Sequence, residues 1–427
     1  MRAFGQHYPV GPVTFFLRLV LVGSTSLRAA SRLFSLIGAS LHLDLGEPDW
    51  TTGRWWLMRI GLAKLLEAKE RADDWVLLMD HSAQIGREKC LLILGLRASE
   101  MPPPGTCLGH EDVRPICLRV LEDPDKHMVQ EELAAVAKEI GAPRAIVNDF
   151  GADIHGGVKL FQEQHPQTIE IYDITHKCAC LLKHRLEKDE RWSTFTRQVG
   201  QTKIALLQTE LACLIPPHQR TKARYMNLET LLAWGKKTLG VLEQPPAELL
   251  ATTTRERLEQ KLGWLPAYRE ALVEWSEWQT VVTSTESLLR RMGLSTTTPQ
   301  DVAKELRPLV NHASTRVLAR ELKAFAVSQA APLRPGERLP ASTEVLESCF
   351  GKLKVLEKDQ ARNGLTGMVL SLGAMVWKFS ADTVHQALEK VSVRGVKEWI
   401  AKNIGTTVQA QRRLVYKPQA ACETKMG

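Results

Sequence analysis

The stretch that most constrains the fold of this chain is residues 74–82, in which five apolar residues stand in a row between charged neighbours. The run WVLLM at residues 75–79 is too short for an independent helix and is typical of a strand buried on both faces. It ends in a carboxylate, Asp80. A second apolar run at residues 89–96 follows a turn-like segment, which predicts a hairpin with Asp80 at its open end.

The length and charge of the chain limit what it can be. Its 427 residues exceed what one core usually supports, so we expect two or three domains. The formal net charge is +8, and the basic residues are spread along the chain, which favours a polyanion such as nucleic acid as partner.

Cysteine and hydropathy patterns indicate the compartment. The eight cysteines include no C-x-x-C pair, so they predict reduced core thiols in a cytoplasmic protein, here one associated with the nucleoid. The apolar segment 15–22 is interrupted by Arg18 and is far shorter than the roughly 20 residues of a membrane span. We therefore expect no export signal and no membrane segment.

Residues 1–70 show a helical pattern and form the first expected domain. Ser24 or Ser26 is placed to cap a second helix, and Asp49 to cap a third that carries Arg54 and Arg59. Three short helices with a basic third helix favour a helix-turn-helix domain in which Arg54 and Arg59 contact DNA. The alternative is a plain helical bundle with a solvated basic face.

Residues 71–180 alternate between strand-like and helical segments. Further strands are predicted at 114–121, 145–148 and 168–172, with a helix from about 127 to 140, so two hairpin steps and later crossovers give a mixed five-stranded sheet. The fourth and fifth strands also end in carboxylates, Asp149 and Asp173. Asp153 is an alternative to Asp149, but it lies beyond Gly151 and away from the strand end.

The rest of the chain is predicted to be helical. Residues 181–335 form an all-helical insertion interrupted by prolines, and residues 336–400 return to further helices of the core. The first of these helices starts near Ser342 and carries two acids in its first turns, Glu344 and Glu347. Residues 401–427 form a basic tail that includes Arg412 and Arg413.

The acids suggest a chemistry. Two carboxylates at neighbouring strand ends repel each other unless a proton or a divalent cation lies between them. Oxygen ligands without a histidine cluster suit Mg²⁺ or Mn²⁺. A third carboxylate from a helix would complete a two-metal site for phosphoryl transfer.

Taken in order, these features resemble the DDE transposases with an RNase H-like catalytic core. Asp80 ends the first strand, Asp149 stands in IVNDFGADIHGGV, and Glu347 stands in STEVLESCFGKLK after a helical insertion. The resemblance implies an α/β RNase H-like fold in which Asp80, Asp149 and Glu347 are catalytic and hold two Mg²⁺ (or Mn²⁺) ions. The segment from Asp173 to His176 is similar to the C/D-x-x-H signature of the hAT, Mutator and related insertion-sequence families, which implies a supporting role for both residues.

The resemblance also suggests contacts with DNA. Lys354 follows Glu347 by seven residues, the E-x6-K spacing with which some insertion-sequence transposases hold a DNA end, and two helical turns put both on one face. The Tyr and Arg that precede the acid in that motif are absent, and Pro340 and Thr343 stand in their places. An extruded base would stack on an aromatic ring of the insertion, here Trp275 or Trp278, although tryptophans at this spacing also suit a core.

The sequence therefore predicts a transposase that cleaves DNA at the ends of a mobile element and joins them to target DNA. Its partners would be double-stranded DNA of the element ends and of the target, and pairing two ends implies at least a homodimer. Two alternatives remain: a catalytically inactive DNA-binding protein derived from such an enzyme, and a stand-alone RNase H-like nuclease.

Overall fold

The computed structural model describes residues 2–3, 5–85, 88–219, 225, 228–358, 366–376, 380–405 and 415–416. The chain divides into two compact units. Met1–Pro102, Leu108–Ile171 and Thr343–Gly427 form the first, here called the sheet unit, while Pro103–Cys107 and Tyr172–Ser342 form the helical unit. Arg412 and Arg413 of the expected basic tail lie outside the described residues. Within the described ranges, no helix combines the length and the apolar character that crossing a bilayer requires.

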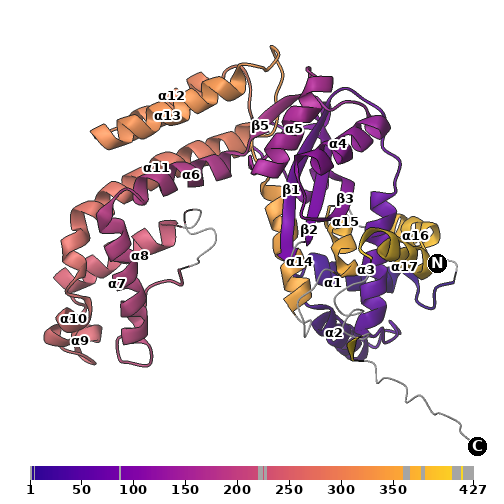
Figure 1. Cartoon of the computed structure of the whole chain (residues 1–427). Coiled ribbons are helices and arrows are strands. Elements are labelled where there is room, and N and C mark those ends of the chain that lie inside the picture. Colours follow the sequence, from indigo (N-terminus) through magenta and orange to yellow (C-terminus); the bar gives the residue numbers. More distant parts are fainter. Residues whose placement is uncertain are drawn as a thin grey trace, which may run out of the picture. The chain divides into compact units, whose positions relative to one another are not determined.

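The sheet unit is built on five strands in the order β3-β2-β1-β4-β5 (Figure 1). They are β1 (Trp75–Ile85), β2 (Glu88–Arg97), β3 (Arg114–Glu122), β4 (Ala145–Asn148) and β5 (Ile169–Tyr172). β2 runs antiparallel to both β1 and β3, and β4 runs parallel to β1. The predicted mixed five-stranded sheet is thus confirmed, and the apolar run that opens β1 is completely buried, as its composition predicts.

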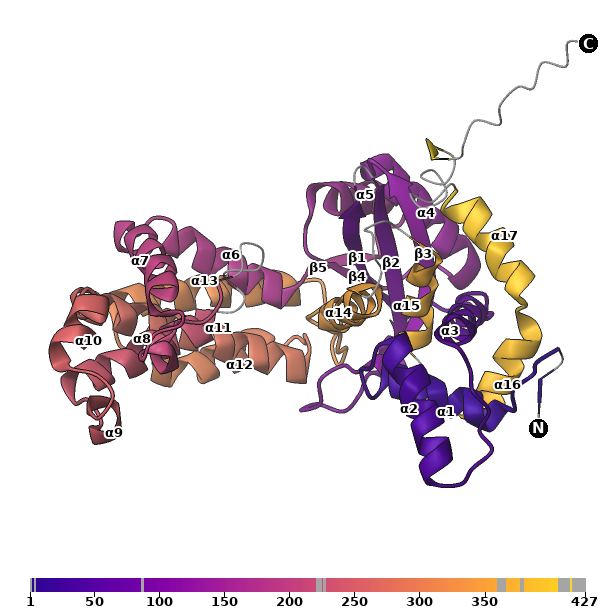
Figure 2. The ribbon, with the colours of Figure 1, turned by 90° about the horizontal axis from the view of Figure 1, so that it is seen from below.

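One face of the sheet is covered by α4 (Lys126–Ile140) and α5 (Ala152–Gln164), as Figure 2 shows. Because side chains alternate along a strand, Trp75, Leu77 and Met79 all point to this face and join the core formed with the two helices. Fully burying a leucine or methionine side chain contributes about 1.5–3 kcal/mol. This face therefore carries the largest part of the hydrophobic core around the sheet.

The opposite face carries α3 (Trp50–Leu65), α14 (Glu344–Lys358) and α15 (Ser371–Met375). α14 packs on β1, while α3 and α15 contact β3 and each other. The contact of α3 with the segment that leads into α15 depends on Gly61, because a Cβ atom there would collide with the carbonyl oxygen of Leu370. Around α3 lie α1 (Val10–Leu21), α2 (Leu27–Ser40), α16 (Ala381–Lys390) and α17 (Val393–Asn403).

The basic third helix differs from its prediction. α3 belongs to the sheet unit, and most of its second half is buried, including Arg59, which is 4% exposed. The Arg59 guanidinium donates hydrogen bonds to the carbonyl oxygens of Leu388 and Val391 at the end of α16. Residues 1–70 thus fall in the same compact unit as the sheet, and the DNA contact of Arg59 stays a prediction. A cation beside unsatisfied helix-terminal carbonyls is favourable, which explains the position of Arg59.

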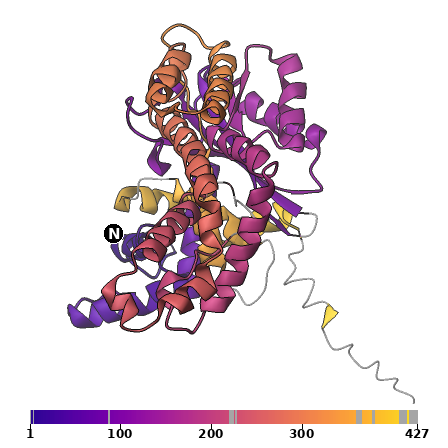
Figure 3. The same ribbon diagram turned by 90° about the vertical axis from the view of Figure 1, so that its left-hand side faces the viewer.

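The helical unit is organised around the longest helix, α11 (Arg269–Met292), the salmon helix in Figure 3. α11 packs against α6 (Ile174–Leu186), α8 (Leu228–Glu243), α12 (Thr298–Leu306) and α13 (Ala313–Ala330). α7 (Glu190–Leu206), α9 (Ala247–Leu250) and α10 (Arg255–Leu262) complete the helices described here. The unit starts and ends somewhat outside the expected limits of 181–335.

Replacing Gly61 with alanine tests the backbone contact beneath the sheet. We expect Gly61→Ala to lower the free energy of unfolding by about 1–3 kcal/mol, since the backbone of α3 must move away from Leu370. The exposed Gly351 of α14 is the control, because a Cβ there meets nothing within 4 Å and should stabilise the helix by roughly 0.5–1 kcal/mol. Denaturant unfolding measures both, and equal effects would contradict this packing.

Candidate active site

Asp80 and Asp149 each follow the paired segment of two neighbouring parallel strands. Leu78 of β1 pairs with Val147 of β4, and each aspartate stands two residues further along its chain. Side chains two residues apart on a strand point to the same face, and neighbouring strands lie about 4.8 Å apart. Asp80 therefore lies on the face opposite α4 and α5, Asp149 directly follows the last residue of β4, and both are half-buried.

The chain turns sharply after β4, and short hydrogen bonds fix this turn. Asp149 Oδ1 accepts a hydrogen bond from the backbone N–H of Gly151 (2.8 Å), and Asn148 Oδ1 accepts one from Phe150 (2.7 Å). Phe150 has a φ of 59°, a left-handed conformation that costs a non-glycine residue about 1–2 kcal/mol. The two side-chain bonds offset this cost and hold Asp149 at the strand end. On β1, Asp80 Oδ1 accepts from the N–H of His81 (2.6 Å).

A polar network that sequence analysis missed lies behind this turn. Asn148 is completely buried and donates from Nδ2 to Glu170 Oε1 on β5 (2.9 Å). Nδ1 of His155 lies 3.0 Å from the same oxygen, and its ring stacks on Phe150 with centroids 4.5 Å apart. The Glu170 side chain is only 3% exposed. Polar residues at buried positions of two short apolar strands were the signal available for this network.

Asp153, the alternative to Asp149, is engaged elsewhere. Its Oδ2 lies 2.9 Å from Lys89 Nζ and 3.3 Å from His81 Nε2. Burial raises the pKa of Asp153, but the hydrogen bond from Lys89 and the proximity of His81 outweigh it and leave this pKa below its ordinary value. Burial lowers the pKa of His81, with Lys89 acting in the same direction and the two carboxylates of Asp153 and Asp149 against it. This arrangement favours Asp149 as the second acid.

The two candidates for the third acid differ in burial. Glu344 is exposed at the first residue of α14, whereas Glu347 is half-buried one turn later, on the helix that packs against β1. Lys354 is exposed two turns beyond Glu347. Among the residues that the structure describes, no group of three or more His, Cys, Asp or Glu side chains is close enough to hold a metal ion. The assembly of all three acids therefore stays a prediction.

A buried charge pair lies further along α14. Burial raises the pKa of Glu357 to about 7, with the nearby Arg54 guanidinium acting against this rise. Burial likewise lowers the pKa of Arg54. Neither Arg54 Nε nor Glu357 Oε1 has a hydrogen-bond partner among the described residues. Arg54 is thus half-buried against α14, and its predicted contact with DNA stays a prediction.

Asp173 and His176 belong to the helical unit and share a local structural role. Asp173 is completely buried and caps α6 by accepting a hydrogen bond from the backbone N–H of His176 (2.7 Å). Such a cap contributes about 1 kcal/mol to helix stability. The support that these residues would give to a metal site stays a prediction.

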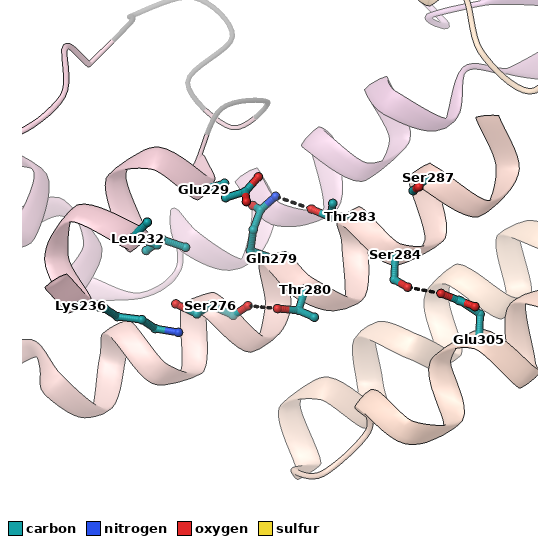
Figure 4. A pocket seen from close by; sticks show the side chains of 11 residues that line it. Glu229, Leu232, Lys236, Ser276, Gln279, Thr280, Thr283, Ser284, Ser287 and Glu305 are labelled. Atoms are coloured by element: carbon teal, nitrogen blue, oxygen red, sulfur yellow. Dashed lines mark hydrogen bonds between the residues drawn. The ribbon is translucent and has the colours of Figure 1, made fainter. Parts of the chain in front are cut away.

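The tryptophans predicted to stack on a base are core residues. Trp275 and Trp278 are both buried, and Trp275 donates from Nε1 to Asp189 Oδ2 (2.9 Å) while packing edge-to-face on Trp192. Their burial agrees with the core alternative for this spacing, and the stacking of an extruded base on either ring stays a prediction. A groove of about 510 Å³ lies beside α11 (Figure 4). The side chains of α11 that line it are polar, such as Ser276, Thr280 and Ser284, and neither indole is among them.

Comparisons with known proteins give little guidance. No family model matches the sequence, and no curated protein matches it. One solved structure that the chain matches is the Drosophila P element transposase strand transfer complex. The TM-score is 0.40 at 10% identity, with 87% of this chain and 92% of that chain covered. At this level of similarity the likeness carries no argument about function.

The raised pKa of Glu357 predicts a pH-dependent stability. The fold favours its protonated form, so its contribution to the free energy of unfolding is complete below the ordinary pKa of 4.5 and is lost as the pH rises through about 7. We expect the thermal midpoint of wild type to fall more over this range than that of Glu357→Gln. Glu344→Gln, at an exposed site of the same helix, should keep the wild-type profile. Parallel profiles for wild type and Glu357→Gln would contradict this prediction.

Proposed function

We propose that this protein is a transposase with an RNase H-like core, which cleaves DNA at the ends of a mobile element and transfers the ends to target DNA. The observation that carries the proposal is the parallel pairing of β1 with β4, in which Asp80 and Asp149 each follow the pair Leu78–Val147 by two residues, while α14, the helix of Glu347, packs on β1. The strand order, with one parallel pair between β1 and β4, supports the same core.

The residues at this place suit a divalent cation by their chemistry. Their donors are carboxylate oxygens without cysteine, the set that favours Mg²⁺ or Mn²⁺. Gly151 keeps the space beside Asp149 open, because a Cβ there would lie 3.1 Å from Asp149 Oδ1. In the proposal Asp80, Asp149 and Glu347 hold two such ions, which when bound supply positive charge for the attacking and leaving oxygens of phosphoryl transfer.

The protein's own residues would orient the acids and the DNA. The Gly151 N–H holds one oxygen of Asp149 in place, and both aspartates are only half-buried. Lys354 is exposed about 10 Å along α14 from Glu347, a position from which it would contact a DNA phosphate. We further propose that Asp173 and His176 support the site, and that pairing of two element ends requires at least a homodimer.

Removing any of the three acids tests the proposal. We expect Asp80→Asn, Asp149→Asn and Glu347→Gln each to lower DNA cleavage by about 100-fold or more, because the loss of one charged ligand removes several kcal/mol of transition-state stabilisation. Binding to the same DNA should remain. Cleavage is measured with Mg²⁺ or Mn²⁺ on DNA that flanks the protein's own gene, and breaks are mapped by sequencing.

Two carboxylates that lie outside the proposed set provide the controls. Asp153→Asn removes an acid paired with Lys89, and Glu344→Gln removes an exposed acid of α14, so both variants should cleave within about tenfold of wild type. Retained cleavage in Asp80→Asn would refute the assignment. Specific binding by wild type without any breaks would instead favour an inactive DNA-binding relative.

A further inference from the structure

The helical unit contains a basic cleft between α12, the short helix η6 (Arg307–Leu309) and α13. Its volume is about 650 Å³. Four of its lining residues are cations, and the rest are apolar residues such as Leu306 and Val310. The cations are Arg307, Arg316, Arg320 and Lys323, and all four are exposed.

Three of the cations form a row. Arg316, Arg320 and Lys323 are spaced by four and three residues, which places them on one face of α13. With a rise of 1.5 Å per residue, the row extends for about 10 Å. Arg307 joins it from η6, so charges from two elements converge on one cleft.

No carboxylate neutralises this cluster. The lining of the cleft contains neither Asp nor Glu, and none of the four cations forms an ion pair with a described residue. The acids of the same helices are engaged elsewhere, since Glu321 pairs with Arg185 and Glu305 accepts a hydrogen bond from Ser284. Four like charges without partners repel one another, and an anionic ligand would relieve that repulsion.

We propose that this basic cleft binds the phosphate backbone of DNA. The inference rests on the proposed function and adds a binding surface to it in the helical unit. Phosphates of one duplex strand recur about every 3.4 Å along the axis, so the row on α13 spans roughly three phosphate steps. A site for a small anion would enclose its ligand and bury its polar groups, whereas all four cations here are exposed. Such contacts position DNA without reading its sequence.

The salt dependence of binding tests the basic cleft. In the full-length protein, Arg316→Ala, Arg320→Ala and Lys323→Ala are combined, and affinity for duplex DNA flanking the gene is measured by fluorescence anisotropy over a range of salt concentrations. Each lost phosphate contact lowers the slope of log K against log salt by about 0.9, so the triple variant should lose about 2.7. We expect its affinity at low salt to fall at least tenfold.

Two control variants distinguish binding by the basic cleft from a general effect of net charge on DNA affinity. Combining Lys188→Ala, Arg197→Ala and Lys237→Ala removes three exposed cations elsewhere in the helical unit and should change the slope much less. Combining Arg316→Lys, Arg320→Lys and Lys323→Arg keeps the charge of the row and should keep most of the slope. The thermal midpoint of each variant verifies folding.

Several outcomes would overturn the inference. If wild type binds and cleaves DNA while the cleft variant keeps its slope, the cleft is not a DNA surface and the proposed function stands. Equal losses in the two alanine triples would assign the effect to net charge alone. Tripolyphosphate that raises the thermal midpoint of wild type but not of the cleft variant, with DNA affinity unchanged, would make the cleft a small-anion site. If wild type binds no DNA at any salt concentration, both proposals fail.

Discussion

The parallel pairing of β1 with β4 is the interaction on which the candidate site depends. In this pairing Asp80 and Asp149 each follow the pair Leu78–Val147 by two residues, although 68 other residues separate them in the chain. The strand that carries Asp80 is anchored by completely buried apolar residues, and the turn that carries Asp149 is fixed by its own hydrogen bonds. The hydrophobic core thus stabilises the strand that carries Asp80, and local hydrogen bonds stabilise the turn that carries Asp149.

Because side chains alternate along β1, Asp80 and His81 lie on opposite faces of the sheet. Asp80 points to the face of α14, whereas the next residue, His81, points to the face of α5 and meets Asp153. The face of α5 therefore carries an acid that is paired with Lys89. A shift of one residue in the register of β1 would exchange these roles, so the long hairpin with β2 protects the site by fixing that register.

The sequence pattern predicted those features that depend on residues close together in the chain. The apolar run at residues 75–79 predicts the buried start of β1, but the expected strand end at Asp80 is wrong, because pairing with β2 continues β1 through the polar residues up to Ile85. The position of Arg59 was not predictable, because its partners are carbonyl oxygens at the end of α16, more than 300 residues away. The role of Trp275 was ambiguous for the same reason. Its partners belong to another helix, since Trp192 lies on α7 and Asp189 caps it, and the VEWSEWQ pattern does not indicate them.

The contact between Arg59 and α16 also bears on how the protein is made. Arg59 reaches the ribosome exit early, yet its partners at Leu388 and Val391 are synthesised after the entire helical unit. α14, which covers β1, is also late. During translation the helical unit is therefore complete before the sheet unit is closed, and the part of the sheet face that α14 covers stays open in the meantime. Apolar surface that is exposed in this way during synthesis is prone to aggregation.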